Sequence, residues 1–426
     1  MRILQTVHQY PPHSVGGTEM YTQNLSRGLQ ARGHDVAVFH RGKPLSKPAV
    51  ESSTDGCGVR VHSYREKMPA GSAGLFLRSF RNRRLESAFD ELLAREEPNV
   101  VHFQHLKDLS VALPCLAHSR DIVTVLSLHD YWYMCPNAQL IQWANGRTCR
   151  GPKLWLNCGY LCAARRAGWP MALFPGPLAS VLFAYRHLAL RRVLSIADLV
   201  VCPSEFARSL FIRRGFPAAK LITCENGIEP PDRGTLSVAR RDDAIHLLYL
   251  GSIAWQKGVH VLVEAFNRVG APGVRLTICG DETVFPDYSR SLRRLASESV
   301  EFRGPLTRTQ VWAALASADA VVVPSLWYEV SPLVIQESFA AGVPVIASRI
   351  GALTEKVRDG VDGFLFPAGD ANELAHLLRR VAMDPSVLHG LTGNLPAVKT
   401  VADCAEEMEA LYERCLGRRG RSDGGR

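Results

Sequence analysis

The chain has 426 residues, of which 46% are hydrophobic and 21% charged, so it is a globular protein too long for one ordinary core. Two domains of about 200 residues each are the natural expectation. Its 50 basic and 41 acidic residues give a net charge of +9, which favours acidic partners such as nucleotides or anionic lipids. We expect no nucleic-acid partner, because no zinc-finger spacing, RNP motif or aromatic-studded basic helix occurs.

The first half of the chain alternates between strand-like and helix-like runs. RILQTV at 2–7 predicts a strand, and a loop with Gly16 and Gly17 leads into a helix from about Thr18 to Arg32. Further strands are predicted at DVAVF (35–39), NVVHF (99–103), IVTVLSLHD (122–130), DLVVCPS (198–204) and KLITCENGI (220–228). This alternation is typical of a parallel sheet with crossover helices.

The second half is more regular. A polar, proline-bearing segment at 229–243 predicts a linker. Beyond it, strands are predicted at 245–252, 275–280, 300–304, 319–325, 344–348 and 363–367, separated by helical segments. We therefore expect a domain at 1–228 with an insertion at 131–170, and a second at 244–395. A helix at 396–416 is expected to return to the first domain, and GRRGRSDGGR at 417–426 to be a disordered basic tail.

One short stretch, WYEVSPLVIQE at 327–337, places two acids around a helix start. Ser331 is a good N-cap, Pro332 suits the first helical position, and Gly342 supplies a C-terminal stop. Glu329 then lies in the loop before the helix and Glu337 on its second turn. The unpaired amides of such a helix start suit a phosphate, while carboxylates accept hydrogen bonds from sugar hydroxyls. The alternative is a solvated surface helix with two ordinary acids.

Other polar residues fall at the carboxyl ends of predicted strands, where open parallel sheets bind ligands. Gly251, Ser252 and Lys257 follow one strand, and a lysine there could reach a diphosphate as a mobile charge. His129 ends another strand. The alternatives are a solvated loop lysine and a structural histidine.

Together these motifs resemble the retaining glycosyltransferases of the GT-B fold, family 4, over nearly the whole chain. The most specific element is the E-x7-E pattern, with VPSLWYE leading into it and ESFAAGVPVIAS behind. The resemblance implies an α/β fold of two Rossmann-like, doubly wound domains that face each other across a cleft. The domain at 1–228 would lie on the acceptor side, and the domain at 244–395 would bind the nucleotide sugar.

The resemblance also implies a role for each motif residue. His129 and Glu329 would be catalytic and contact the transferred sugar, and Glu337 would bind the ribose. The remaining donor-binding residues would be Gly16, Gly17, Gly251, Ser252, Lys257, Ser331, Pro332 and Leu333. The chain departs from the family at Ser252, where many members have arginine, at Ser331, where many have glycine, and at Gly351-Ala352, where a double glycine is common.

The chemistry expected from these residues needs no cofactor. No D-x-D sequence occurs, so a metal-bridged diphosphate is not predicted, and helix amides with Lys257 would stabilise the leaving group. The resemblance implies a nucleotide-diphosphate sugar as donor, a glycan or lipid-linked acceptor, and a place in envelope polysaccharide or glycolipid synthesis. Two alternatives stay open: a nucleotide-sugar epimerase of the same architecture, and a catalytically silent nucleotide-sugar-binding subunit.

Two further segments carry expectations of their own. Residues 75–85 and 181–194 mix large apolar residues with arginines, which predicts peripheral binding to an anionic membrane; the alternative is two ordinary amphipathic helices packed on the sheet. No signal-peptide pattern is visible, so we expect the cytoplasmic face.

Cys135, Cys149, Cys158 and Cys162 gather within 28 residues of the insertion. They predict either a structural zinc site or packed free thiols.

Overall fold

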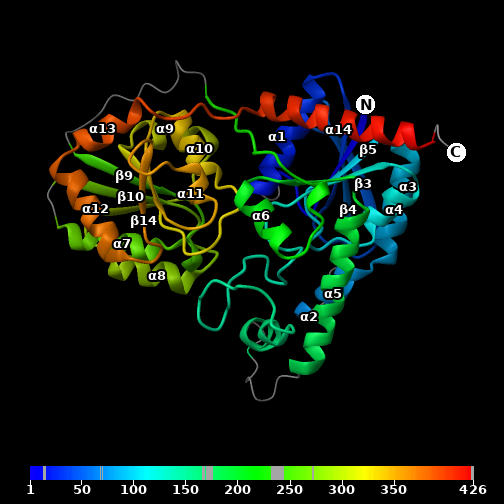
Figure 1. The fold of residues 1–426 in the computed structure, drawn as a ribbon, viewed down its shortest axis with the longest axis horizontal. Coiled ribbons are helices and arrows are strands. Elements are labelled where there is room, and N and C mark those ends of the chain that lie inside the picture. The colour runs from blue at the N-terminus through cyan, green and yellow to red at the C-terminus, as the bar shows by residue number, and fades with distance from the viewer. Residues whose placement is uncertain are drawn as a thin grey trace. The chain divides into compact units, whose positions relative to one another are not determined.

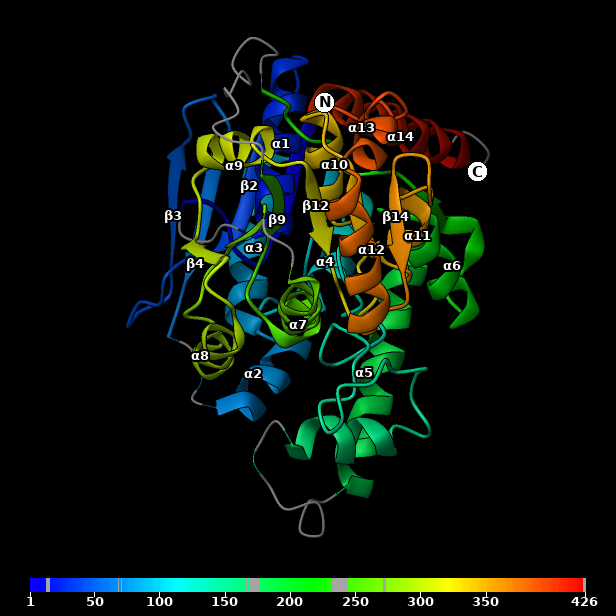
Figure 2. The same cartoon turned by 90° about the vertical axis from the view of Figure 1, so that its left-hand side faces the viewer.

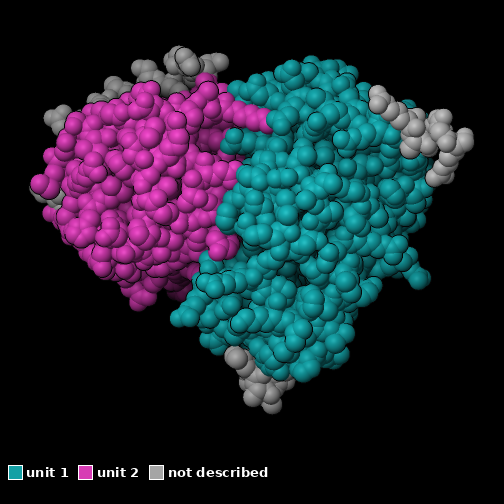
Figure 3. All heavy atoms as spheres, in the orientation of Figure 1, with its two compact units in different colours: residues 1–227, 400–426 teal, residues 228–399 magenta. Residues whose placement is uncertain are grey.

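In a computed structural model the chain forms two compact units, residues 1–227 with 400–426 (unit 1) and residues 228–399 (unit 2), coloured separately in Figure 3. The structure describes residues 1–12, 16–67, 69, 71–165, 168, 176–231, 244–270 and 273–423. Most of the predicted linker, residues 232–243, lies outside the described residues, as do residues 166, 167, 169 and 170 of the predicted insertion.

Unit 1 is built on an eight-stranded sheet in the order β3-β4-β2-β1-β5-β6-β7-β8, of which β3, β4 and β5 are labelled in Figure 1. Its strands are β1 (Arg2–Val7), β2 (Asp35–Arg41), β3 (Ala49–Thr54), β4 (Arg60–Arg65), β5 (Val100–Phe103), β6 (Val123–Ser127), β7 (Leu199–Cys202) and β8 (Leu221–Thr223). Every neighbouring pair is parallel except β3–β4, which is antiparallel. The strand order reverses between β1 and β5, and in sheets of this kind ligands bind beyond the carboxyl ends of the strands at that point.

The helices of unit 1 cover both faces of this sheet. They are α1 (Gly17–Ala31), α2 (Gly71–Phe80), α3 (Arg83–Glu96), α4 (Leu113–Ser119), α5 (Gly176–Ile196), α6 (Glu205–Arg213) and α14 (Val401–Asp423), with a π-helix at Cys158–Ala164 and a 3-10 turn at Ala218–Lys220. Strand residues such as Ile3 and Val36 form one core with Leu25 of α1 and Met408 of α14. The carboxyl-terminal helix is thus part of unit 1.

Unit 2 is a fully parallel six-stranded sheet in the order β11-β10-β9-β12-β13-β14. Its strands are β9 (Ile245–Leu250), β10 (Val274–Cys279), β11 (Val300–Gly304), β12 (Ala320–Val323), β13 (Val345–Ser348) and β14 (Gly363–Phe366). Its helices are α7 (Val259–Val269), α8 (Pro286–Leu295), α9 (Arg308–Ala316), α10 (Leu333–Ala340), α11 (Leu353–Lys356), α12 (Ala371–Met383) and α13 (Ser386–Thr392), with a 3-10 turn at Trp255–Lys257. Here the order reverses between β9 and β12.

The two faces of the unit 2 sheet bury separate cores, because successive strand residues point to opposite sides. Leu247 and Tyr249 of β9 pack with α7 and α12, which lie side by side in Figures 1 and 2, whereas Leu248 packs with α9 and α10. The doubly wound α/β architecture predicted from the sequence is therefore confirmed for each unit.

Two features differ from expectation. The β3–β4 hairpin was not predicted, because most residues of AVESST in β3 are exposed and lack an apolar alternation. The predicted disorder from residue 417 is wrong for residues 417–423, which continue helix α14 to Asp423. Arg419 explains the extension: its guanidinium lies 2.7 Å from Asp121 and 2.7 Å from Asp198.

Candidate functional site

Two of the predicted ligand-binding residues, Lys257 and Glu329, lie at the switch point of unit 2, where the strand order reverses between β9 and β12. Glu329 follows β12 and is only 5% exposed. Its Oε1 accepts hydrogen bonds from Lys257 Nζ at 2.8 Å, Ser325 Oγ at 2.7 Å and Trp327 Nε1 at 2.9 Å. Glu329 Oε2 accepts none from the described residues. Three donors therefore fix the carboxylate and leave its second oxygen available to a ligand hydroxyl.

The loop after β9 packs closely against the loop after β12. Gly258 has φ +70°, and a Cβ placed there would lie 1.9 Å from Pro324 O, so only glycine fits. The adjacent Lys257 ammonium also lies over the Trp327 ring, 5.4 Å from its centroid. This packing explains why Lys257, predicted as a mobile charge, is instead held on Glu329.

Helix α10 begins later than the sequence predicts. Its N-cap is Pro332, with no side-chain cap, and its first residue is Leu333, so the prediction of Ser331 as N-cap is wrong. The backbone of Pro332 is extended at φ −72° and ψ 105°, which places Ser331 outside the helix. Ser331 Oγ is buried without a hydrogen-bond partner among the described residues. The helix has no acid in its first turn, so its amides can receive an anion.

Glu337 lies on the second turn of α10, as predicted. It forms an ion pair with Arg308 at the start of α9, and its side chain is 13% exposed. The Arg308 guanidinium also stacks over Trp312, 4.7 Å from the ring centroid. Arg308 therefore fixes the direction of the Glu337 carboxylate.

Gly251 and Ser252 occupy the turn after β9. Gly251 has φ +153°, and its carbonyl approaches Gly280 so closely that a Cβ there would lie 2.0 Å away. The carbonyl of exposed Ser252 accepts a hydrogen bond from Tyr249 OH at 2.8 Å. Both residues are therefore at the carboxyl edge of the sheet, in the same unit as Lys257 and Glu329.

His129 lies at the carboxyl edge of unit 1, after β6. Its Nε2 lies 2.7 Å from Gln104 Oε1, which can only accept, so Nε2 carries the proton and Nδ1 is an acceptor. Burial, together with nearby His105, lowers the pKa of His129 to about 3, and the ring is neutral at pH 7. Gln104 in turn donates to Gln5 at 2.8 Å.

This network continues to the carboxyl-terminal helix. Tyr412 OH of α14 lies 2.7 Å from His102 Nδ1 and accepts from Gln5 Nε2 at 3.3 Å. The ring of His102 is also bonded through Nε2 to Ser127 Oγ at 2.8 Å. The orientation of His129 therefore depends on a buried polar chain that ends on a residue near the carboxyl terminus.

Gly16 and Gly17 begin helix α1 in unit 1. Gly16 is its N-cap, and a Cβ on Gly16 would lie 2.5 Å from Glu19 Oε2. An acidic side chain of the first turn therefore already lies at this helix start. The predicted catalytic and donor-binding residues are thus divided: Gly16, Gly17 and His129 belong to unit 1, and the others belong to unit 2.

Sequence reasoning missed several supporting residues. Ser325 and Trp327 lie in VPSLWYE (323–329), so their closeness to Glu329 in sequence could have predicted them as its partners. Arg308 lies 29 positions before Glu337, and Tyr412 lies 310 positions after His102. Such distant partners leave no local pattern.

The four insertion cysteines, for which the sequence left a zinc site and packed thiols both open, do not have the geometry of a metal site. Among the residues that the structure describes, no three His, Cys, Asp or Glu side chains are arranged to hold a metal ion. Cys135 donates to Asn137 Oδ1 at 2.6 Å and Cys149 lies 3.6 Å from Gly151 O, as expected of thiols. Burial raises the pKa of Cys135 to about 11 and also raises the pKa of Cys158. The structure therefore favours the alternative of packed thiols.

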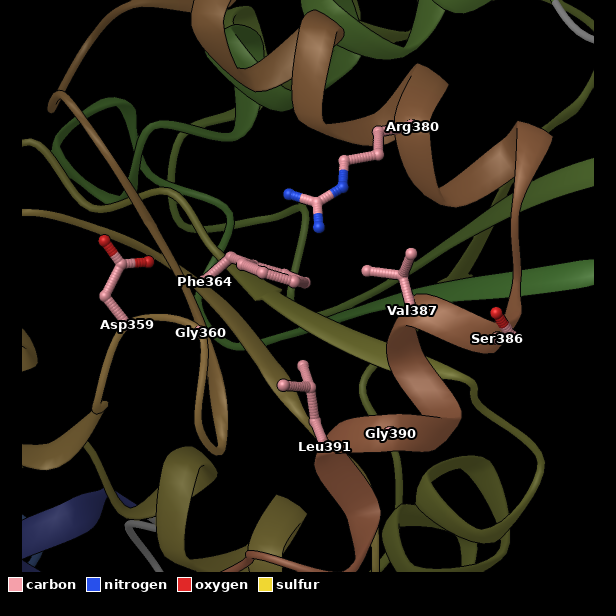
Figure 4. A pocket seen from close by; sticks show the side chains of 8 residues that line it. All are labelled: Asp359, Gly360, Phe364, Arg380, Ser386, Val387, Gly390 and Leu391. Atoms are coloured by element: carbon pink, nitrogen blue, oxygen red, sulfur yellow. The ribbon is translucent and has the colours of Figure 1, made fainter.

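A separate cavity of about 550 Å³ opens in unit 2 (Figure 4). It is lined by Asp359, Gly360, Phe364, Arg380, Ser386, Val387, Gly390 and Leu391. Arg380 lies over the Phe364 ring, 5.3 Å from its centroid. None of the predicted site residues lines this cavity.

Comparison with known proteins identifies first the class of protein. The sucrose-phosphate synthase of Thermosynechococcus elongatus has a similar structure, with a TM-score of 0.70, 20% identity, and coverage of 98% of this chain and 100% of that one. The Anabaena HepE structure in complex with UDP and glucose gives a TM-score of 0.67 at 19% identity, covering 97% of this chain and 99% of that one. The fold is therefore the GT-B fold.

Sequence comparison then gives the family. Residues 15–231 match "Glycosyltransferase Family 4" and residues 244–384 match "Glycosyl transferases group 1". The chain is 33% identical to the D-inositol 3-phosphate glycosyltransferase of Pseudarthrobacter chlorophenolicus over 95% of this chain and 92% of that protein. It is 29% identical to a glycogen synthase of Mycobacterium tuberculosis over 91% of this chain and 87% of that protein. The chain belongs to glycosyltransferase family 4 and transfers sugar from a nucleotide sugar, so the epimerase and silent-subunit alternatives are not supported.

Proposed function

We propose that this enzyme moves a sugar, with retention, from a nucleotide-diphosphate sugar bound by unit 2 to a glycan or lipid-linked acceptor bound by unit 1. The observation that carries the proposal is the set of three hydrogen-bond donors that hold Glu329. Two residues later comes the Ser331 hydroxyl, which has no partner among the described residues, and then the start of α10, whose first turn has no acid. A fixed carboxylate beside an anion-accepting helix start suits the two halves of such a donor, its sugar and its diphosphate.

The diphosphate, the transferred sugar and the ribose of the nucleotide sugar would then each have a partner in unit 2. The amides of Leu333 and its neighbours would receive the diphosphate, with Lys257 as the nearby cation and Gly251-Ser252 allowing close backbone approach. Glu329 would bind hydroxyls of the transferred sugar and Glu337 those of the ribose. His129 of unit 1, with a neutral ring and an Nδ1 acceptor, would bind a hydroxyl of the same sugar.

The transfer step requires no protein nucleophile. The acceptor oxygen bonds to the anomeric carbon, the bond from that carbon to the diphosphate breaks, and the acceptor proton passes to the departing phosphate oxygen. Helix amides and Lys257 stabilise the charge that develops on that phosphate. We propose that catalysis needs no metal, because the chain has no D-x-D sequence.

The donor assignment is tested with the purified full chain. UDP, GDP and ADP, each alone and as a sugar conjugate, are added in a thermal-shift series, because a ligand at 100 times its dissociation constant adds about 2.7 kcal/mol of stability. UDP-glucose is the first candidate, since HepE binds it. Stabilisation by one nucleotide, followed by its release from the matching sugar conjugate, supports the proposal. Failure of every nucleotide diphosphate to stabilise the chain contradicts it.

We also propose peripheral membrane binding through α2 and α5, which lie side by side in unit 1 (Figures 1 and 2). Leu178, Val181, Leu182, Tyr185 and Leu188 of α5 are 42–65% exposed, and their spacing puts them on one face of the helix. Arg83 and Arg84 beside α2 are exposed and have no ion pair among the described residues, whereas Arg186 of the predicted basic set is buried. No helix in the described parts of the chain is long and apolar enough to cross a membrane.

Flotation with vesicles of anionic lipid at low salt tests this surface. Each cation near such a membrane contributes about 1 kcal/mol. Wild type should float with the vesicles, the double variant Leu178→Ser, Leu188→Ser should not, and Met383→Ser, a change at an 87% exposed residue of unit 2, should behave as wild type. Wild-type protein that stays in the pellet rules the surface out. Binding would favour an envelope polysaccharide or glycolipid pathway.

A further inference from the structure

A cluster of two acids and two histidines lies at the switch point of unit 1, and the donor chemistry above does not use it. His8 follows β1, and its Nε2 lies 3.4 Å from Glu19 Oε1. His105 follows β5, and its Nε2 lies 3.0 Å from Asp130 Oδ2. The two rings are 4.7 Å apart, so the pairs join into one acid–histidine cluster of Glu19, His8, His105 and Asp130. It stands where a sheet of this topology binds its ligand.

The hydrogen bonds of the cluster fix which atoms carry protons. The Lys107 backbone N–H donates to His105 Nδ1 at 2.9 Å, so the other ring nitrogen of His105 donates to Asp130. Asp130 also accepts from the Trp132 N–H at 2.8 Å, which leaves acceptor capacity on the carboxylate. His8 Nδ1 is buried without a partner among the described residues.

The charge of the cluster is unfavourable to an anion. Burial opposes ionisation of Asp130, but His105 and the Trp132 amide hold its pKa below the usual value. Burial, with His105 and Lys107 nearby, lowers the pKa of His8 to about 2, so its ring is neutral. Exposed Lys107 is the cation that acts on His8. Buried Arg186 also acts on Asp130, but its guanidinium is only 4% exposed and donates to Trp132 O at 2.6 Å. Among the described residues, a ligand here therefore meets two carboxylates, one exposed lysine and the neutral rings of His8 and His129.

The helix start beside the cluster does not reverse this balance. The first turn of α1 would suit an anion if it were open, but the Glu19 carboxylate lies against Gly16. A phosphate brought to this edge would meet two like charges, Glu19 and Asp130. A sugar hydroxyl would meet the carboxylate oxygens, which accept hydrogen bonds.

We infer that the acceptor group bound at this edge is an uncharged, hydroxyl-rich sugar and that a phosphorylated sugar is rejected. The inference rests on the proposed function, in which unit 1 binds the acceptor. It separates this enzyme from its relative named for D-inositol 3-phosphate, although the two chains are 33% identical. Specificity here comes from repulsion of the wrong acceptor as much as from binding of the right one.

The test compares matched acceptors with the donor that the nucleotide screen identifies. Glucose and glucose 6-phosphate form one pair, myo-inositol and a myo-inositol phosphate a second, and maltotriose serves as a longer neutral acceptor. The neutral member of a pair should give at least tenfold higher kcat/KM. Preference for a phosphorylated member, or no transfer to any neutral acceptor, overturns the inference. Nucleotide binding and donor hydrolysis are measured in parallel, so loss of the donor function would be recognised separately.

Charge-removing variants give the sharper result. Asp130→Asn and Glu19→Gln should each lower kcat/KM for the neutral acceptor about tenfold and narrow the ratio between neutral and phosphorylated acceptors, with the nucleotide Kd unchanged. Asp90→Asn is the matched control, because Asp90 lies on α3 and pairs with Arg120. Melting curves exclude misfolded variants. An unchanged acceptor ratio in both cluster variants would contradict the inference.

Discussion

Helices α1 and α10 begin in comparable places, each after a strand of a doubly wound sheet, yet their surroundings are opposite. At α1 a carboxylate of the first turn lies against the N-cap Gly16, and it is paired with His8. At α10 the first turn has no acid, Ser331 Oγ has no partner among the described residues, and Glu329 is already bound to Lys257. The same element can therefore serve hydroxyls in one unit and a diphosphate in the other, according to where its acids lie.

The largest expected effect is a difference in acid stability between the units. Burial lowers the pKa of His8 to about 2 and those of His102 and His129 to about 3, all in unit 1, whereas in unit 2 burial lowers the pKa of His260. The unfolded imidazole takes up a proton below pH 6.5 and the folded one does not, so stability is complete above pH 6.5 and falls as the pH drops towards 3. Each of His8, His102 and His129 costs about 2 kcal/mol of stability at pH 5.

Hydrogen exchange at pH 7 and pH 5, corrected for the intrinsic exchange rate, measures this difference. Amides in β1, β5 and β6 should lose much more protection than amides in β9 and β12. The variant His8→Asn should flatten the loss in unit 1. Equal losses in the two units would show that the buried histidines of unit 1 do not control its acid stability.

The second prediction concerns the clamp at α10. Glu329→Ala removes the acceptor of three hydrogen bonds and leaves Lys257 without its partner, so kcat should fall about a hundredfold while the nucleotide Kd changes little. Glu301→Gln, a change to an exposed acid paired with Arg303 in the same unit, is the control. A Glu329→Ala variant with wild-type turnover would show that Glu329 takes no part in catalysis.

Glu337→Ala should change nucleotide binding more than turnover, the reverse of the effect expected for Glu329→Ala. The residue lies one helical turn beyond the anion-binding start and would contact only the ribose, so nucleotide binding should weaken about tenfold with kcat nearly unchanged. Calorimetry with the nucleotide diphosphate measures the Kd directly. A lower kcat with an unchanged Kd would exchange the roles given to the two glutamates.

These residues also mark what sequence alone could predict. The predicted strands, the placement of Glu329 and Glu337 around a helix start, and the strand-end position of His129 depend on local patterns and agree with the structure, although β3 and β4 were missed. The prediction of Ser331 as the N-cap of α10 does not agree with the structure, because the start of this helix depends on the backbone angles at Pro332. Arg308 and Tyr412 were missed because their partners come from distant parts of the chain. For the four cysteines the sequence left a zinc site and packed thiols both open, because clustering in sequence does not fix the geometry of ligands, and the structure favours packed thiols.

The smallest expected effect tests whether the carboxyl-terminal helix supports the active site from a distance. Tyr412→Phe removes the hydroxyl bonded to His102 and Gln5, whose amide is bonded to Gln104, the residue that holds His129. Each buried hydrogen bond that is lost costs about 1 kcal/mol of stability, and kcat should fall a few-fold with the nucleotide Kd unchanged. Tyr288→Phe is the matched control, because it removes a similar bond, 2.8 Å from His260 Nδ1, in unit 2. Both variants should melt earlier, but only Tyr412→Phe should lose turnover. An equal effect of the two variants on kcat would mean that Tyr412 contributes to stability alone and does not position His129.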